Sequence, residues 1–176
     1  MDNTTEITPV QHVKGNNNNT PTAKTLQFLT FTVMGEEYGV DIMTVREIKG
    51  WTESTRLPNS PDYMRGVMNL RGIIIPIFDL RIRFHQVSAE SSSKNVIIIM
   101  AVGSRNIGIL VDTVSDILTA NEADIRPAPE VESQTNSNFI NGLISLEDRM
   151  VVLLSVDKLF GAELLKTNEQ DLAQSA

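Results

Sequence analysis

Two stretches of the sequence match each other, GVDIMTVREI at residues 39–48 and GILVDTVSDI at residues 108–117. Both consist of Gly, five variable residues, Val, one variable residue, an acid and Ile, and each follows a strand-like run and a turn. Their valines, Val45 and Val114, are 69 residues apart (114 − 45). When an ordered series of matches recurs along a chain, it indicates duplication, so we expect two copies of one small unit.

Further matches follow each copy in the same order. They are RLP at residues 56–58 with RP at 126–127, Gly66 with Gly142, and Asp79-Leu80 with the segment Asp157 to Leu159. The glycines are 76 residues apart (142 − 66), so the copies differ by a few loop residues. We expect two small β-barrels of similar build, packed against each other because each is too small to be stable alone.

The local pattern favours strands over helices. Residues 29–33 alternate apolar side chains with Thr, which is typical of a half-buried strand. Residues 73–75 and 96–102 are short β-branched runs bounded by turn-forming residues, which also predicts strands. Pro76 cannot donate a hydrogen bond to a sheet, so we expect its strand to lie at an edge or to carry a bulge.

Short helices are expected between the strands. Ile42, Val45 and Ile48 recur every three residues within 41–48, and Lys49-Gly50 provides a helix stop. Asp157 is a candidate cap for a final helix. The chain is therefore expected to be mostly β, with short helices and a C-terminal helix.

Neither end of the chain has a core-forming pattern. Residues 1–24 are rich in Asn and Thr and residues 167–176 are polar, which predicts flexible tails around one domain at 25–166. The start does not resemble a signal peptide, and the longest apolar run, 96–102, is too short to span a membrane. We expect a cytoplasmic protein without direct membrane insertion, and the lack of Cys fits a reducing compartment.

Composition argues against nucleic-acid binding and catalysis. With 15 Lys and Arg against 22 Asp and Glu, the net charge of −7 would repel a polyanion. The only histidines, His12 and His85, lie far apart and there is no Cys, so no metal site or activated nucleophile is indicated. Residues 103–108 have the glycine spacing of a phosphate loop but lack its Lys-Ser/Thr. We expect no catalytic residue, cofactor or metal; an enzyme with an unrecognised site is the alternative, which a nucleotide-binding screen would distinguish.

Charge is distributed unevenly between the two copies. Residues 56–83 carry five Arg against two Asp, whereas residues 112–132 carry six acids against one Arg. Such a distribution is compatible with two solvated faces. It is equally compatible with a protein that docks its partners in a fixed orientation through complementary electrostatic fields.

Four segments resemble the CheW family of chemotaxis coupling proteins, especially the enterobacterial type. They are NLRGIIIPIFDLR at 69–81, EEYGVDI at 36–42, GILVD at 108–112 and IRPAP at 125–129. The resemblance covers about residues 26–160. It implies two tandem five-stranded SH3-like barrels that are intertwined around a shared core, and a non-catalytic adaptor. Such an adaptor couples the cytoplasmic tips of transmembrane methyl-accepting chemotaxis receptors to the regulatory domain of the histidine kinase CheA, within membrane-associated arrays.

The resemblance also assigns roles to individual residues. Ile42 and Val45 match apolar kinase-binding positions, whereas Glu47 and Arg71 match charged receptor-binding positions. From the pattern alone, Ile42 and Val45 would be core residues and Arg71 a solvated turn residue. Because Glu47 and Arg71 carry opposite charges, we further predict that they pair with each other.

Two apolar positions complete the predicted receptor surface. Val114 and Ile117 match residues in or beside the receptor-binding groove. Two relatives of the same fold stay as alternatives, the coupling module of a receiver-linked adaptor and a detached regulatory domain of the kinase. Both normally carry a further domain, for which 24 leading and about ten trailing residues are expected to leave no room.

Overall fold

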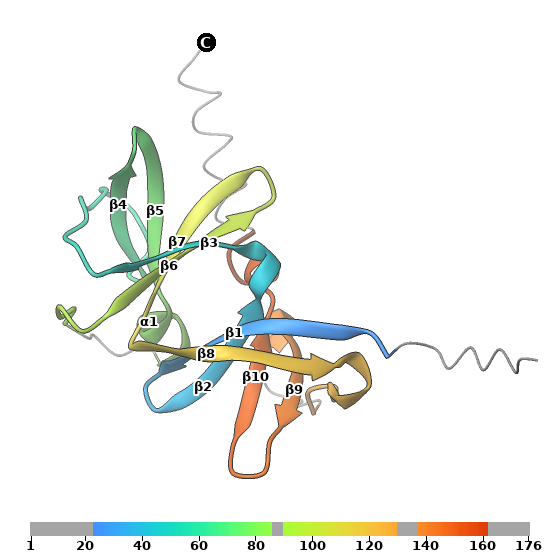
Figure 1. Ribbon diagram of the computed structural model, residues 1–176. Helices are drawn as coiled ribbons and strands as arrows, with labels where there is room; N and C mark the ends of the chain where they lie inside the picture. Colours follow the sequence, from blue (N-terminus) through green and yellow to red (C-terminus); the bar gives the residue numbers. More distant parts are fainter. Residues whose placement is uncertain (1–22, 86–89, 130–136, 162–176) are drawn as a thin grey trace, which may run out of the picture.

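The computed structural model describes residues 23–85, 90–129 and 137–161. Within these residues the chain forms two five-stranded sheets and several short helices (Figure 1). The strands are β1 (Thr25–Val33), β2 (Glu36–Asp41), β3 (Val45–Gly50), β4 (Met64–Leu70), β5 (Ile73–Asp79), β6 (Val96–Val102), β7 (Arg105–Val111), β8 (Thr113–Asn121), β9 (Ile140–Ser145) and β10 (Met150–Leu154). The helices are η1 (Ile42–Thr44), α1 (Leu80–His85), η2 (Glu122–Asp124), η3 (Ser137–Phe139) and a segment at residues 156–161. The predicted mostly β fold with short helices and a C-terminal helix is confirmed.

The order of strands in the sheets differs from their order in the chain. One sheet, called barrel A, runs β8-β1-β2-β10-β9, and the other, barrel B, runs β3-β6-β7-β5-β4. Barrel A therefore combines β1 and β2 of the first sequence copy with β8, β9 and β10 of the second, and barrel B does the reverse. Figure 1 shows this exchange where the blue β1 lies beside the golden β8. Neither barrel can form from one copy alone.

An additional backbone pair closes each sheet into a barrel. Thr55 pairs with β4 and Arg126 pairs with β9, each through two hydrogen bonds of 2.8 and 2.9 Å. These pairs explain two of the matched glycines. A Cβ atom at Gly66 would collide with the carbonyl group of Thr55, and one at Gly142 would lie 2.9 Å from the carbonyl oxygen of Arg126. The closure thus requires Gly at both positions.

The glycines that begin the repeat also occupy equivalent places. Gly39 on β2 lies opposite Leu153 on its parallel neighbour β10, and Gly108 on β7 lies opposite Ile77 on its parallel neighbour β5. A Cβ atom at Gly39 would approach Leu153 Cδ2 to 3.0 Å, and one at Gly108 would collide with the Ile77 side chain. The register therefore supports the duplication inferred from the sequence.

The sequence repeat matches Asp79 with Asp157, but the structure shows that the residue equivalent to Asp79 lies two positions earlier. Asp79 directly precedes α1, and the residue that directly precedes the final helix is Ser155 rather than Asp157. The backbone N–H of Lys158 donates to Ser155 Oγ at 3.4 Å, which makes Ser155 the helix cap.

Buried apolar side chains form three clusters. The largest, called the shared core, draws from both barrels and the final helix, and includes Phe31, Val40, Phe78, Ile98, Ile109 and Phe160. Barrel A has its own cluster of Phe28, Ala120, Ile144, Val151 and Leu153. Barrel B has a cluster of Ile75, Ile77, Ile97, Ile99 and Leu110. The predicted shared core between two barrels is therefore present.

The helix predicted at 41–48 is wrong beyond its first turn. The Asp41 carboxylate accepts a hydrogen bond of 2.9 Å from the Met43 N–H and caps η1, but the chain turns extended at Val45, with φ −74° and ψ 130°. From there β3 pairs with β6. Pairing with a distant strand outweighs the three-residue spacing, because β-branched Val45 and Ile48 suit a strand well.

Pro76 lies neither on an edge strand nor at a bulge of its own strand. β5 is flanked by β4 and β7, and the register irregularity of the β4–β5 pair falls between Met64 and Gly66. Pro76 is opposite Val67, whose backbone hydrogen bonds go to Thr55 on the other side. Pairing of β5 with β7 begins only at Ile77. The proline nitrogen is therefore not required as a donor on either side.

The predicted tails fall largely outside the described residues. Of residues 1–24 only 23 and 24 are described, and residues 162–176, including the end of the predicted domain, are not. In the part of the chain that is described, no helix has the length and apolar character needed to cross a membrane.

Candidate functional site

Glu47 and Arg71 form the ion pair that their opposite charges predict. Arg71 and Gly72 have φ values of 51° and 83° and make the two-residue turn between β4 and β5, a hairpin geometry that needs positive φ at both positions. Asn69 Oδ1 accepts from the Gly72 N–H at 2.8 Å and fixes this turn. Arg71 Nη2 then donates to Glu47 Oε2 of β3 at 2.8 Å. The pair links β3 to the β4–β5 turn.

The charges around Glu47 favour its ionised form. The hydrogen bond from Arg71 is the largest cause that lowers the pKa of Glu47, and the positive charges of Arg71 and Lys49 act in the same direction. Lys49 Nζ lies 3.7 Å from Glu47 Oε1. Arg71 itself is 73% exposed, so its guanidinium can meet a partner while it stays bound to Glu47.

Exposed isoleucines flank this ion pair in the sequence. Ile48 follows Glu47 on β3 and is 47% exposed, and Ile73 and Ile74 follow the turn and are 56% and 61% exposed. The run 73–75 is thus buried only at Ile75. Its β-branched composition predicted the strand correctly but contained no signal for the exposure of its first two residues. The charged pair and three exposed isoleucines thus lie within a few residues of one another along β3 and β5, and exposed apolar side chains of this kind are suited to protein binding.

Ile42 and Val45 lie close together at η1 and the start of β3, and both are half-buried against the shared core. Met43 between them is 76% exposed. Ile42 and Val45 thus contact the core, as their spacing indicated, and the most accessible apolar side chain at this turn is Met43, which the sequence pattern did not single out. The sequence contained one signal for the exposure of Met43, because a residue between two core-facing positions points outward.

Val114 and Ile117 lie on β8, in barrel A. Val114 is opposite Phe31 and half-buried against the shared core, whereas Ile117 is opposite Leu29 and 51% exposed. Through the repeat they correspond to Val45 and Ile48 of β3. The structure thus places the six predicted residues on η1, on β3 and β8, which are equivalent through the repeat, and on the β4–β5 turn. Among the described side chains, Glu47 and Arg71 are the two of the six that bond to each other.

A buried cluster of charges holds β5 and α1. Asp79 is fully buried, and its Oδ2 accepts from Arg65 Nε and from Arg81 Nη2, both at 2.8 Å. Arg81 also reaches the side chain of Asn95 at 3.4 Å and lies 3.8 Å from Asp112. The hydrogen bond with Asp79 raises the pKa of Arg81, against the effect of burial. These charges are mutually satisfied, which is the pattern of a structural cluster rather than of reacting groups.

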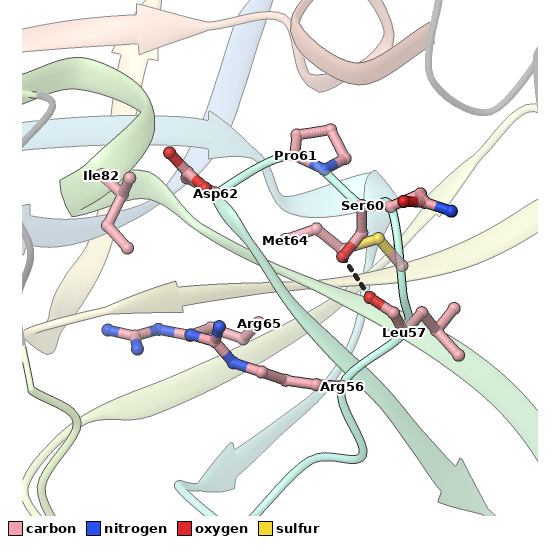
Figure 2. A pocket seen from close by; sticks show the side chains of 9 residues that line it. Arg56, Leu57, Ser60, Pro61, Asp62, Met64, Arg65 and Ile82 are labelled. Carbon is pink, nitrogen blue, oxygen red and sulfur yellow. Dashed lines mark hydrogen bonds between the residues drawn. The ribbon is translucent and has the colours of Figure 1, made fainter.

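The loop before β4 forms a shallow pocket of about 460 Å³ (Figure 2). Arg56 and Arg65 extend together on one side of it, and Asp62 and Ile82 lie on the other. Ser60 Oγ donates to the Leu57 carbonyl at 2.8 Å and stabilises a turn. None of the six predicted residues lines the pocket. Among the described residues, no group of three or more His, Asp or Glu side chains could hold a metal ion.

Comparison with known proteins places these features in one family. Residues 27–164 match the family model described as CheW-like domain. Chemotaxis protein CheW of Klebsiella aerogenes is 44% identical over 137 residues, which cover 78% of this chain and 82% of that protein. CheW of Rhizobium meliloti is 43% identical over 78% of this chain and 88% of that protein. The crystal structure of the scaffolding protein TtCheW from Thermoanaerobacter tengcongensis matches with a TM-score of 0.71 and 31% identity, covering 78% of this chain and 93% of that one.

Proposed function

Since this chain belongs to the CheW family of chemotaxis proteins, which are scaffolds and not enzymes, we propose that it couples transmembrane chemoreceptors to the histidine kinase CheA. The observation that supports the proposal is the presence of two exposed features of different character. One is the Glu47–Arg71 ion pair with its exposed isoleucines, and the other is the η1 turn with exposed Met43. An adaptor needs two such surfaces so that both partners can bind at once.

The charged surface is suited to the receptor. Arg71 keeps most of its side chain exposed while Glu47 holds it, so an incoming chain meets an oriented guanidinium instead of a mobile one. Ile117 and the half-buried Val114 supply apolar contacts on β8, the equivalent strand of barrel A. A receptor hairpin that contacts both strands would bind across the two barrels.

The η1 turn is suited to the regulatory domain of the kinase. Met43 is an unbranched, adaptable apolar side chain of the kind that is favoured at protein interfaces. Ile42 and Val45 anchor the turn in the shared core, so Met43 is presented from a fixed position. Binding of both partners would bring the protein to membrane receptor arrays.

Binding assays with a receptor fragment and with the kinase, separately and together, test this proposal. The protein is expected to retain either partner alone and both at once. Met43→Asp should weaken kinase binding while receptor binding is unchanged, and Met150→Asp, at an exposed Met on β10, is the matched control. Mutually exclusive binding of the two partners would contradict the proposal.

A further inference from the structure

The methionines that the structure describes form a packed group and an exposed group. The packed ones are Met64, Met68 and Met100, which contact the shared core or the apolar cluster of barrel B. The exposed ones are Met34, Met43 and Met150, at 48%, 76% and 54%. Because an oxidant in solution must reach the thioether sulfur, exposed methionines react before packed ones. Met43, the most exposed of them, is the one that we expect to react first.

The hydrogen bonds that hold the η1 turn do not involve the side chain of Met43. The Met43 N–H donates to Asp41 Oδ1 at 2.9 Å, and the Met43 carbonyl oxygen accepts from Arg46 Nη1 at 3.1 Å. Thr44 Oγ1 donates to the carbonyl oxygen of Asp41 at 2.7 Å. A chemical change at the thioether therefore leaves the bonds of the turn in place.

Oxidation would change the character of this side chain without changing its place. A thioether is apolar and polarisable, whereas a sulfoxide is polar and needs a hydrogen-bond donor when it is buried. At the exposed position of Met43, water solvates the sulfoxide and the fold is not affected. In an apolar interface the sulfoxide would lose that water, which costs binding free energy. Oxidation of Met43 therefore opposes its burial against a partner.

The other two exposed methionines lie on different elements. Met34 lies between β1 and β2, where its N–H donates to Asp112 Oδ2 at 2.7 Å. Met150 is the first residue of β10. Both positions belong to barrel A, whereas η1 leads into β3 of barrel B. Met34 and Met150 therefore serve as controls for oxidation outside the η1 turn.

We propose that Met43 is an oxidation site through which hydrogen peroxide controls the binding of the kinase, an inference that rests on the proposed function. In the reaction the O–O bond of the peroxide breaks and one of its oxygens forms an S–O bond with the thioether. The other oxygen leaves with both hydrogens as water, so the sulfur is oxidised by two electrons and the peroxide is reduced. Methionine sulfoxide reductases reverse the change, which makes it suitable for regulation.

Kinase binding and oxidation are linked in both directions. A kinase that covers Met43 binds the reduced protein more tightly than the oxidised one, and it also shields the sulfur from peroxide. We expect Met43 to be oxidised more slowly in the complex with the kinase than in the free protein. An equal rate of oxidation at Met43 in the complex and in the free protein would contradict the proposal.

Treatment of the full-length protein with graded doses of hydrogen peroxide tests the proposal. Peptide mass spectrometry gives the oxidised fraction at each methionine, and kinase affinity and circular dichroism are measured on the same samples. We expect Met43 to be oxidised first and the kinase affinity to fall by about tenfold at its full oxidation, with an unchanged circular dichroism spectrum. Methionine sulfoxide reductase should restore the affinity. An unchanged affinity after full oxidation of Met43 would overturn the proposal.

Leucine variants identify the responsible methionine. Met43→Leu should have the same kinase affinity before and after peroxide, whatever its starting affinity, because leucine has no sulfur to oxidise. The double variant Met34→Leu with Met150→Leu should lose affinity in peroxide as the unmodified sequence does. A loss of affinity in Met43→Leu after peroxide would overturn this inference alone. If the untreated protein fails to bind the kinase, the proposed function is wrong and this inference fails with it.

Discussion

The ion pair between Glu47 and Arg71 shows how far single residues could be predicted. Their pairing follows from opposite charges at two positions that the family resemblance marks as functional. Its geometry depends on the Arg71-Gly72 turn, which places the guanidinium 2.8 Å from a carboxylate 24 residues earlier in the chain. Because Arg71 is largely exposed, the pair contributes little to stability and its loss should leave the fold intact.

Reversing these charges separates two mechanisms of receptor coupling. Glu47→Arg or Arg71→Glu alone should reduce receptor binding, with an unchanged circular dichroism spectrum and melting temperature. If the two side chains act by orienting each other, the double variant Glu47→Arg with Arg71→Glu should recover binding. Continued failure of the double variant would show that at least one charge contacts the receptor directly. Unfolding of the single variants would contradict the surface position of the pair.

The pH response of Glu47 provides an independent check. Its pKa is lowered in the folded protein, chiefly by the bond from Arg71, so the pair's contribution is present above the unfolded-state pKa and is lost as the pH falls through the folded-state pKa. Arg71→Gln should move the carboxyl pKa of Glu47 upward, towards its ordinary value. Carboxyl NMR titration measures this shift. An unchanged titration in the variant would mean that Arg71 does not hold Glu47 in solution.

At the scale of elements, strands were easier to predict than short helices. Alternation at 29–33 and β-branched runs at 73–75 and 96–102 predicted β1, β5 and β6. The segment 41–48 has a helical spacing, yet it becomes η1 followed by β3 because β6 supplies hydrogen-bond partners from a distant part of the chain. No local pattern contains that information. The exposure of Ile73 and the cap at Ser155 depend likewise on the position of each element in the fold.

The closure of barrel B predicts that position 66 does not tolerate a side chain. It has φ 138°, and a Cβ atom there would collide with the Thr55 carbonyl that closes barrel B. Gly72 also has positive φ, at 83°, but open space around it, so it is the matched control. Gly72→Ala should cost about 1 kcal/mol of unfolding free energy, because a Cβ atom disfavours the left-handed conformation, and Gly66→Ala should cost clearly more, as measured by chemical denaturation. Equal costs would mean that the Thr55 pair is not needed for closure.

At the scale of the whole molecule, the family resemblance implied intertwined barrels, but the identity of the exchanged strands was beyond the reach of the sequence. The repeat predicted two similar units, but Gly39 and Gly108 carry no mark of which copy provides their neighbouring strands. The structure completes each barrel with strands of the other copy, and the shared core lies between them. Tertiary pairing, rather than local propensity, decides these features.

Strand exchange predicts that the two halves depend on each other. A fragment of residues 1–89 contains β1 to β5 but cannot complete either sheet, so it should lack cooperative unfolding and NMR dispersion. The fragment of residues 90–176 should behave in the same way. Mixing both fragments should restore a folded β spectrum. Independent cooperative folding of either fragment would contradict the exchanged topology.

The most direct test of the adaptor account is kinase autophosphorylation measured with the receptor, the kinase and this protein in all combinations. The account predicts that activity rises above that of the kinase alone only when all three are present. Met43→Asp should abolish the rise by weakening kinase binding, by about thirtyfold if Met43 contributes about 2 kcal/mol. Arg71→Glu should abolish it while kinase binding is retained. A full rise without the receptor, or an unchanged rise with both variants, would contradict the central claim.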